Sequence, residues 1–286
     1  MRDRVRSIVY IAVGILIAAT TIALLVLRIE RVREAGPRTT TKYNLKLCAE
    51  AIHGFHDTYR RLPDAFAKGG AFPKNEVSLW VRLFPFVESN NVHRMFLAGE
   101  NPAMVIPSYN SPDDPHNDDA AGKVNFAANL RIFGLQSIGQ EAAINVGVGF
   151  EVPVAATSGL TLARITGGAS NVIMLTTRYS HCGDQFTEYV RSPNHPGGGF
   201  FGAGTYGMPP SGAPNNNDLM FQSTPELRDC NHSPGIYGHA FGRQGLMVAA
   251  ADTSIRFIAT NSSPRVFAKA ICPDGGFGRD PELIDE

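Results

Sequence analysis

The sequence lacks the features that mark several large classes of protein. Lysine plus arginine and aspartate plus glutamate both number 26, so no basic excess points to a nucleic-acid partner. Only four cysteines occur, and none forms a Cys-x-x-Cys pair, which argues against a zinc ribbon or a thioredoxin-type site. No nucleophile elbow, His-Glu-x-x-His motif or Ser-His-Asp signature is visible, so we expect no enzyme. A content of 43% hydrophobic residues still indicates a globular chain.

A long apolar run without charge lies near the N-terminus, at residues 8–27. Twenty residues at about 1.5 Å each span about 30 Å, the thickness of a bilayer's hydrocarbon core. A cleaved signal peptide is the alternative, but its apolar region would be shorter and would lead into a small-residue cleavage site. We therefore expect an uncleaved single-pass anchor within a tail-and-anchor segment 1–35, bound to membrane lipid through 8–27, and one domain over 36–286.

The orientation of this anchor is poorly marked by charge. Three arginines precede the run and four follow it, so the positive-inside rule is close to balanced. All four cysteines follow the run, which is compatible with one or two disulfides in an oxidising compartment.

Helical periodicity continues beyond the apolar run. Gly36-Pro37 is expected to break or kink the helix, which resumes near Thr40, and Pro63 to end it. Apolar residues then recur at steps of 3, 4, 3 and 4, which predicts one buried stripe of a helix: Leu45, Cys48, Ile52, Phe55 and Tyr59. Cys48 lies on this stripe and is expected in the core.

Two segments contain residues that could bind a metal ion. His53 and His56 are three residues apart and could share a metal on a helix, although a zinc site needs further ligands. The alternative is that one histidine is solvated and the other caps or packs in the following turn. The second hypothesis is a calcium site in an acidic loop that contains Asp113, Asp114, Asp118 and Asp119. The spacing of these residues is not that of a helix-loop-helix calcium site, and the loop could equally be solvated. No other cofactor is expected.

The rest of the chain predicts an α+β fold with long loops. Residues 78–96 read as a second helix or helix-turn with Trp80 buried, and 192–218 as a long loop. Short β-type runs are separated by turn residues, at 124–134, 144–155, 171–179, 244–251 and 254–260. The expected architecture is an N-terminal transmembrane helix, then an amphipathic helix packed on an antiparallel sheet.

Four stretches together resemble a known family, the pilin-like domain of unknown function 1559, from about Asn44 to Gly276. They are NLKLCAEAIHGFHDTYRRLPDAF, SLWVRLFPFVES, ITGGASNVIMLTTRYSHCG and FGRQGLMVAAADTSIRFI. The resemblance implies a structural signature at Asn44, His53, His56, Asp57, Tyr59, Pro63 and Asp252. It also implies that His56 and Asp57 hydrogen-bond backbone groups in the turn after the helix.

The chain also departs from the pattern of that family. The Gly-Phe-Thr-Leu-x-Glu prepilin junction is missing, so processing and assembly into a true fibre are not expected. Gly242 stands where the family has a histidine, for which His239 is a weak substitute, and Thr253 replaces a glycine.

The resemblance also bears on the cysteines. Thr41 and Ser111 stand where relatives have two cysteines. Because both cysteines are missing from this chain, the resemblance implies that they form a disulfide in relatives. Cys182 and Cys230 sit where one subgroup has cysteines, which implies a Cys182–Cys230 disulfide, with two buried free thiols as the alternative.

The function implied by the resemblance is that of a pseudopilin-like structural or interaction protein of the cell envelope. It would be anchored in the cytoplasmic membrane with a cytoplasmic N-terminus and a periplasmic or extracytoplasmic domain, and would bind protein partners or itself, without nucleic acid. An anchored carbohydrate- or calcium-binding module is the alternative, using the acidic loop and the loop 194–217. The aromatic rings of Phe200, Phe201 and Tyr206 in this loop could stack on sugar rings, or could equally form the core of the loop. A hydrolase using His and Asp is a third hypothesis.

Overall fold

The computed structural model describes most of the chain. The described residues are 2–69, 72–87, 89–100, 103–117, 120–134, 143–145, 151–153, 161–191, 195, 197–201, 221–230, 238–262 and 264–273. Their side chains are described as well, except at 2–9, 11–12, 23–34, 67–69, 72–76, 143–145, 151–153, 264–266 and 268.

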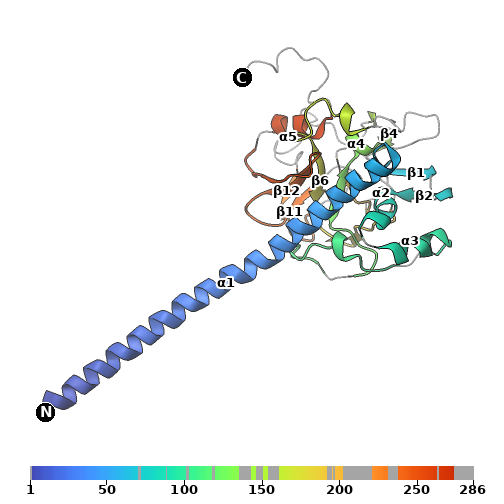
Figure 1. Ribbon diagram of the computed structural model, residues 1–286. Coiled ribbons are helices and arrows are strands. Elements are labelled where there is room, and N and C mark those ends of the chain that lie inside the picture. Colours follow the sequence, from blue (N-terminus) through green and yellow to red (C-terminus); the bar gives the residue numbers. More distant parts are fainter. Residues whose placement is uncertain are drawn as a thin grey trace.

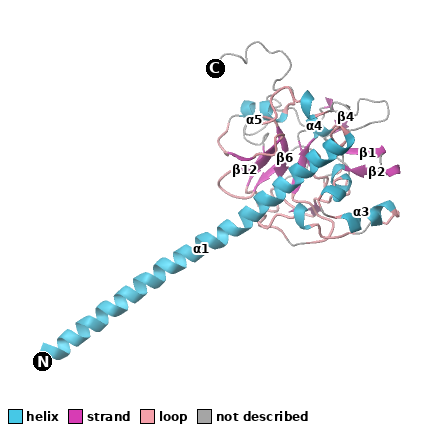
Figure 2. Cartoon of the chain, in the orientation of Figure 1, coloured by secondary structure: helices cyan, strands magenta, loops and turns pink. Residues whose placement is uncertain are grey.

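The described residues form an α+β structure in which one helix is far longer than the others (Figures 1 and 2). The helices are α1 (Arg2–Tyr59), α2 (Leu79–Arg82), α3 (Asn90–Leu97), α4 (Leu130–Phe133) and α5 (Pro264–Ile271). Two-stranded pairs surround the main sheet: β1 (Phe66–Gly69) with β2 (Phe72–Ser78), β4 (Ala143–Asn145) with β5 (Glu151–Pro153), β7 (His181–Cys182) with β8 (Gln185–Phe186), and β10 (Phe221–Ser223) with β11 (Gly238–Ala240).

The main sheet has five strands in the order β13-β12-β6-β3-β9. Four of them are antiparallel and come from the segments expected to be strands: β3 (Phe126–Asn129), β6 (Ile173–Thr177), β12 (Leu246–Ala250) and β13 (Ile255–Ile258). The stripe of α1 joins the core on one face, whereas α5 packs on the other through Phe267, beside Leu246 and Val248 of β12. The expectation of a helix packed on an antiparallel sheet is therefore confirmed for this part of the chain.

The fifth strand was not expected. β9 (Phe200–Phe201) pairs parallel to β3 and comes from the segment predicted to be a loop. A Cβ atom on Gly199 would lie 2.6 Å from Nε1 of Trp80, so only glycine lets the backbone pass this close. The Trp80 indole donates a hydrogen bond to the Gly199 carbonyl (3.0 Å), and both phenylalanines are buried. Phe200 and Phe201 are therefore core residues, the second of the two alternatives for these aromatics, and are not exposed for sugar stacking. Tyr206 lies outside the described residues.

The predicted break at Gly36-Pro37 is also wrong, because α1 runs unbroken through Pro37 (Figure 1). Proline removes one backbone donor and crowds the preceding turn, but the residue before it has no Cβ to clash with the ring. A Cβ on Gly36 would meet nothing within 4 Å, so this turn stands clear of the domain. Thr39 and Thr40 bond their hydroxyls to the carbonyls of Ala35 (2.9 Å) and Gly36 (3.3 Å).

The predicted anchor falls within the N-terminal part of α1. Its residues 8, 9, 11, 12 and 23–27 have side chains outside the described set. Over the residues that are described, no helix combines the length and the apolar character needed to cross a membrane.

The buried stripe of α1 was predicted nearly in full. Leu45, Cys48 and Ile52 are completely buried and Phe55 almost so, which confirms Cys48 as a core residue. Tyr59 at the helix end is half exposed and lies against the rings of Phe55 and Phe86.

The β12–β13 turn holds a threonine in a conformation that suits glycine. Thr253 has a φ of 66°, in the left-handed region, which is rare for a β-branched residue. Asp252 closes the turn by accepting hydrogen bonds from the Ser254 amide (2.9 Å) and hydroxyl (2.6 Å). Burial raises the pKa of Asp252, but these hydrogen bonds outweigh it and leave the pKa below its usual value.

Replacing Thr253 with glycine is expected to stabilise the protein. The strain of the left-handed conformation is relieved, and part of this gain is offset by the greater freedom of glycine in the unfolded chain, leaving about 0.5–1 kcal/mol. Urea unfolding of Thr253→Gly would measure it. Thr260→Gly is the control, because exposed Thr260 is not among the described residues with positive φ, so glycine there should not stabilise. A Thr253→Gly protein no more stable than wild type would contradict the assigned strain.

Candidate functional site

Polar side chains of α1 bind the segment 107–113, an arrangement we call the neck ladder. The Asn44 amide donates to the carbonyls of Pro107 (3.0 Å) and Asn110 (2.8 Å), and the Cys48 thiol lies 3.2 Å from the Ser108 carbonyl oxygen. Successive contacts follow the 3.6-residue period of the helix, beside its apolar stripe. Asn44 therefore ties α1 to the segment 107–113.

The neck ladder continues to the pair Thr41 and Ser111. Their hydroxyl oxygens are 2.7 Å apart, and both residues are completely buried. The two positions at which the resemblance implies a cysteine pair are therefore in contact here, joined by a hydrogen bond.

The last step of the neck ladder is exposed to solvent in part. Arg38 Nε lies 3.5 Å from a carboxylate oxygen of Asp113, whose backbone N–H donates to the Thr41 hydroxyl (3.2 Å). A Cβ on Gly242 would lie 2.9 Å from Nη2 of Arg38, so glycine here leaves room for the guanidinium. The adjoining hollow has a volume of about 10 Å³, which is room for about one water molecule.

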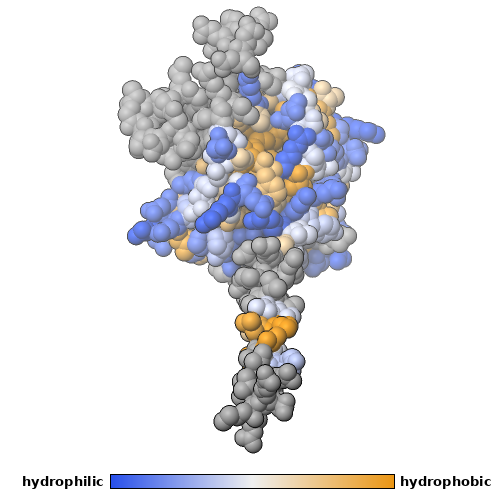
Figure 3. Space-filling model, turned by 90° about the vertical axis from the view of Figure 1, so that its left-hand side faces the viewer, coloured by the Kyte–Doolittle hydropathy of each residue, from blue (hydrophilic) through white to orange (hydrophobic). Residues whose placement is uncertain are grey.

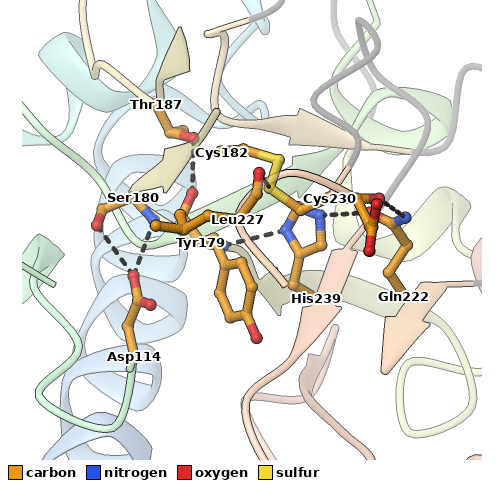
Figure 4. Close-up of a disulfide and its surroundings, with 10 residues drawn as sticks. Asp114, Tyr179, Ser180, Cys182, Thr187, Gln222, Leu227, Cys230 and His239 are labelled. Carbon is orange, nitrogen blue, oxygen red and sulfur yellow. Dashed lines mark hydrogen bonds between the residues drawn. A yellow bond between two sulfur atoms is a disulfide. The ribbon is translucent and has the colours of Figure 1, made fainter. Parts of the chain in front are cut away.

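Asp114 is buried and saturated with hydrogen bonds (Figure 4). One carboxylate oxygen accepts from the Asn125 amide (2.6 Å) and from the amide and hydroxyl of Ser180 (both 2.9 Å), and the other from the His116 amide (2.9 Å). Burial raises the pKa of Asp114, and the bonds from Ser180 and His116 lower it by less. Asp114 thus joins the 111–117 segment to Ser180, in the link between β6 and β7.

Only two of the four aspartates of the predicted calcium site lie among the described residues. Asp113 pairs with Arg38 and Asp114 bonds to protein donors, whereas Asp118 and Asp119 lie outside the described residues. No group of three or more potential metal ligands gathers in the described part of the chain, and this includes the surroundings of His53 and His56.

A second series of hydrogen-bonded groups lies near Asp114 and includes Tyr179 and His239 (Figure 4). The Tyr179 backbone N–H donates to Nδ1 of His239 (3.1 Å), so Nε2 carries the proton and donates to the Gln222 side-chain oxygen (3.1 Å). The Tyr179 ring stacks on His239 at 4.9 Å and on Phe241 at 5.4 Å. His239 is completely buried with both ring nitrogens bonded, so it is held as a structural residue.

The predicted disulfide is confirmed: Cys182 and Cys230 are bonded, with their Cα atoms 5.6 Å apart and a sequence separation of 48. Gly183, at a φ of 58°, turns the β7–β8 hairpin beside this bond. Cys48 and Cys272 are buried thiols outside any disulfide, and burial raises the pKa of the Cys48 thiol.

His53 and His56 differ in role. Nε2 of His53 donates to the Ala251 carbonyl (2.8 Å) and so ties α1 to the turn after β12. Backbone bonding by His56 and Asp57 was predicted and is wrong: the Asp57 side chain is 79% exposed, and Nδ1 of His56 has no hydrogen-bond partner in the described structure. A backbone hydrogen bond closes this turn instead, because the backbone N–H of Arg60 donates to the His56 carbonyl (2.7 Å).

Replacing Asp114 with asparagine is expected to lower the free energy of unfolding by about 2–3 kcal/mol, because an amide group would face buried donors. Asp113→Asn is the matched control, since this partly exposed neighbour has one ion pair and should lose less than about 1 kcal/mol. Chemical denaturation of both variants distinguishes them. Equal losses would show that the Asp114 network does not hold the domain together.

Comparison with known proteins places the chain in a family. No curated protein and no solved structure matches it. A family model described as a protein of unknown function (DUF1559) matches residues 30–265, which is most of the chain. The chain therefore belongs to the DUF1559 family of proteins of unknown function.

Proposed function

We propose that this protein is a membrane-anchored, pseudopilin-like structural or interaction protein of the cell envelope, with its domain outside the cytoplasm. The observation that carries the proposal is the form of α1. Its C-terminal part is built into the domain core, and its N-terminal part projects far beyond the domain (Figure 1).

Apolar side chains on the projecting part of α1 support lipid as its surroundings. They are largely exposed at Tyr10, Val13, Ile15, Leu16, Ile17 and Ile22, and form a hydrophobic band in the described part of the stalk (Figure 3). At about 100° per residue they point in directions all around the helix, whereas a coiled-coil partner would need one stripe. A helix that is apolar all around suits a bilayer, and the lipid contact predicted for residues 8–27 agrees with this.

The disulfide supports an extracytoplasmic domain. Disulfides persist in oxidising compartments and are rare in the cytoplasm. The Cys182–Cys230 bond lies in the domain, so a cytoplasmic N-terminus with the domain across the membrane is the orientation that agrees with it.

The polar groups of the domain support a structural role. Asp114, Ser180 and His239 are the kinds of side chain that catalyse acid–base or nucleophilic reactions, yet each is buried and hydrogen-bonded within the domain. They connect backbone segments, which is what a rigid interaction domain requires. The proposal accordingly assigns the protein no reaction.

Membrane fractionation of cells that make the full chain tests the anchor. The wild-type protein should remain with the membranes after an alkaline carbonate wash, and added protease should degrade the domain in intact spheroplasts. Replacing Ile15, Leu16 and Ile17 with lysine should release it, whereas Leu97→Lys on the domain surface should not. Wild-type protein in the soluble fraction would overturn the proposal.

Chemical crosslinking of the same membranes tests the interaction role. A ladder of multiples of this chain, or a fixed set of neighbouring proteins, is the expected result. A single monomer band at every crosslinker concentration would contradict an interaction role and favour the tethered binding module.

A further inference from the structure

The surface turn 226–230 is attached to the β7–β8 hairpin almost entirely by the disulfide. The turn closes on itself, because the amides of Asp229 and Cys230 both donate to the Glu226 carbonyl (2.9 Å). Besides the sulfur–sulfur bond, one hydrogen bond joins turn and hairpin in the described structure, from the Gly183 amide to the Leu227 carbonyl (3.0 Å). Breaking the disulfide would therefore leave the two turns weakly connected.

The two sulfur atoms belong to residues of unequal burial. Cys182 lies in β7 and is 4% exposed, whereas Cys230 ends the turn and is only partly buried. Thiol–disulfide exchange begins with attack by a thiolate on one sulfur atom, and access decides which one. Cys230 is accordingly the sulfur to be attacked and Cys182 the leaving group.

The network beneath the disulfide does not depend on it. The Tyr179 backbone N–H donates to the side-chain Nδ1 of His239 (3.1 Å), and the Thr177 hydroxyl of β6 donates to the His239 carbonyl (2.8 Å). Thr187 likewise donates from its hydroxyl to the Tyr179 carbonyl (2.8 Å). These contacts would remain when the bond between the turns is broken.

We propose that Cys182–Cys230 is a thiol-exchange site, a latch that a dithiol reductant opens locally while the rest of the domain stays folded. The attacking thiolate forms a bond to the Cys230 sulfur, the sulfur–sulfur bond breaks, and its electron pair leaves on Cys182, which takes up a proton. The second thiol of the reductant then attacks the mixed disulfide, so the protein gains two thiols and the dithiol becomes a disulfide. This proposal does not depend on the membrane anchor.

The site of attack can be tested on the full-length oxidised protein in detergent. The protein is exposed briefly to reduced glutathione and then quenched with acid. Peptide mass spectrometry should find the glutathione adduct on Cys230. An adduct mainly on Cys182, or a disulfide that reacts only after denaturant is added, would overturn the assignment.

Hydrogen exchange with and without dithiothreitol tests whether opening is local. Within the first minutes of labelling, peptides covering 181–187 and 226–230 should exchange about tenfold faster after reduction. Over the same minutes, peptides covering 45–55 of α1 and 173–177 of β6 should stay protected, because their amides exchange only through unfolding of the whole domain. Buried Cys48 and Cys272 serve as an internal control, since iodoacetamide should label Cys182 and Cys230 only. The Cys182→Ser, Cys230→Ser double variant should show the hydrogen-exchange pattern of the reduced wild-type protein, with or without dithiothreitol. Loss of protection throughout the domain within those minutes, or no change in exchange at either turn, would refute the latch.

Discussion

A chain in which Thr41 and Ser111 are both replaced with cysteine is expected to form a second disulfide and to unfold at higher urea concentration than wild type. The hydroxyl oxygens are 2.7 Å apart across a separation of 70 residues, so the side chains already meet. Closing such a loop is worth about 4 kcal/mol in the loop-entropy model, reduced by about 1 kcal/mol for the hydrogen bond that is lost. A net gain of about 3 kcal/mol is the expected result.

Four samples make this experiment decisive: the oxidised double variant, the same variant after reduction, and the two single cysteine variants. Only the oxidised double variant should gain stability, and it should migrate faster than its reduced form on a denaturing gel. Failure to crosslink under mild oxidation would mean that α1 and the 107–113 segment do not meet as described.

Removing the native disulfide is expected to lower the free energy of unfolding by about 4 kcal/mol. The Cys182–Cys230 bond closes a loop across 48 positions, and in the loop-entropy model most of the effect comes from the freed unfolded chain. Thermal and urea unfolding of the Cys182→Ser, Cys230→Ser double variant would measure the loss.

A cysteine outside the disulfide provides the control for this second experiment. Cys272 is buried and its sulfur lies 3.7 Å from Nη1 of Arg131, so Cys272→Ala should lose only some packing and this weak contact, about 1 kcal/mol. A double variant as stable as wild type would mean that this bond does not constrain the unfolded chain.

Local patterns in the sequence were sufficient to predict much of the fold. The stripe of α1 has the helical period and the strands have alternating or continuous apolar runs, and both signals depend on neighbours in the sequence. β12 illustrates this, since Leu246 and Val248 face α5 while Met247 and Ala249 face α1.

Contacts between distant residues could not be predicted in the same way. Asn129 joins Ile173 of β6 to Ile271 of α5, and Asp114 joins Asn125 to Ser180, yet nothing near either residue in sequence marks it. β9 was missed for a similar reason, because a two-residue strand has no period and depends on Gly199 passing close to Trp80. The rule that proline ends or kinks a helix gave the wrong prediction at Pro37. One lost backbone hydrogen bond does not end a helix that continues on both sides of the proline.

The unbroken α1 gives the protein a definite response to tension. A pull on its N-terminal end would act along the helix axis, in the direction in which the neck ladder and the buried stripe resist sliding. The contacts from Arg38 to Ile52 would then share the force in shear, whereas a pull across the helix would peel them apart one at a time. From the ladder the force passes through Asp114 and Ser180 to the sheet. The domain is thus built to remain attached when its stalk is stretched lengthwise, and to come away most easily when the stalk is bent aside.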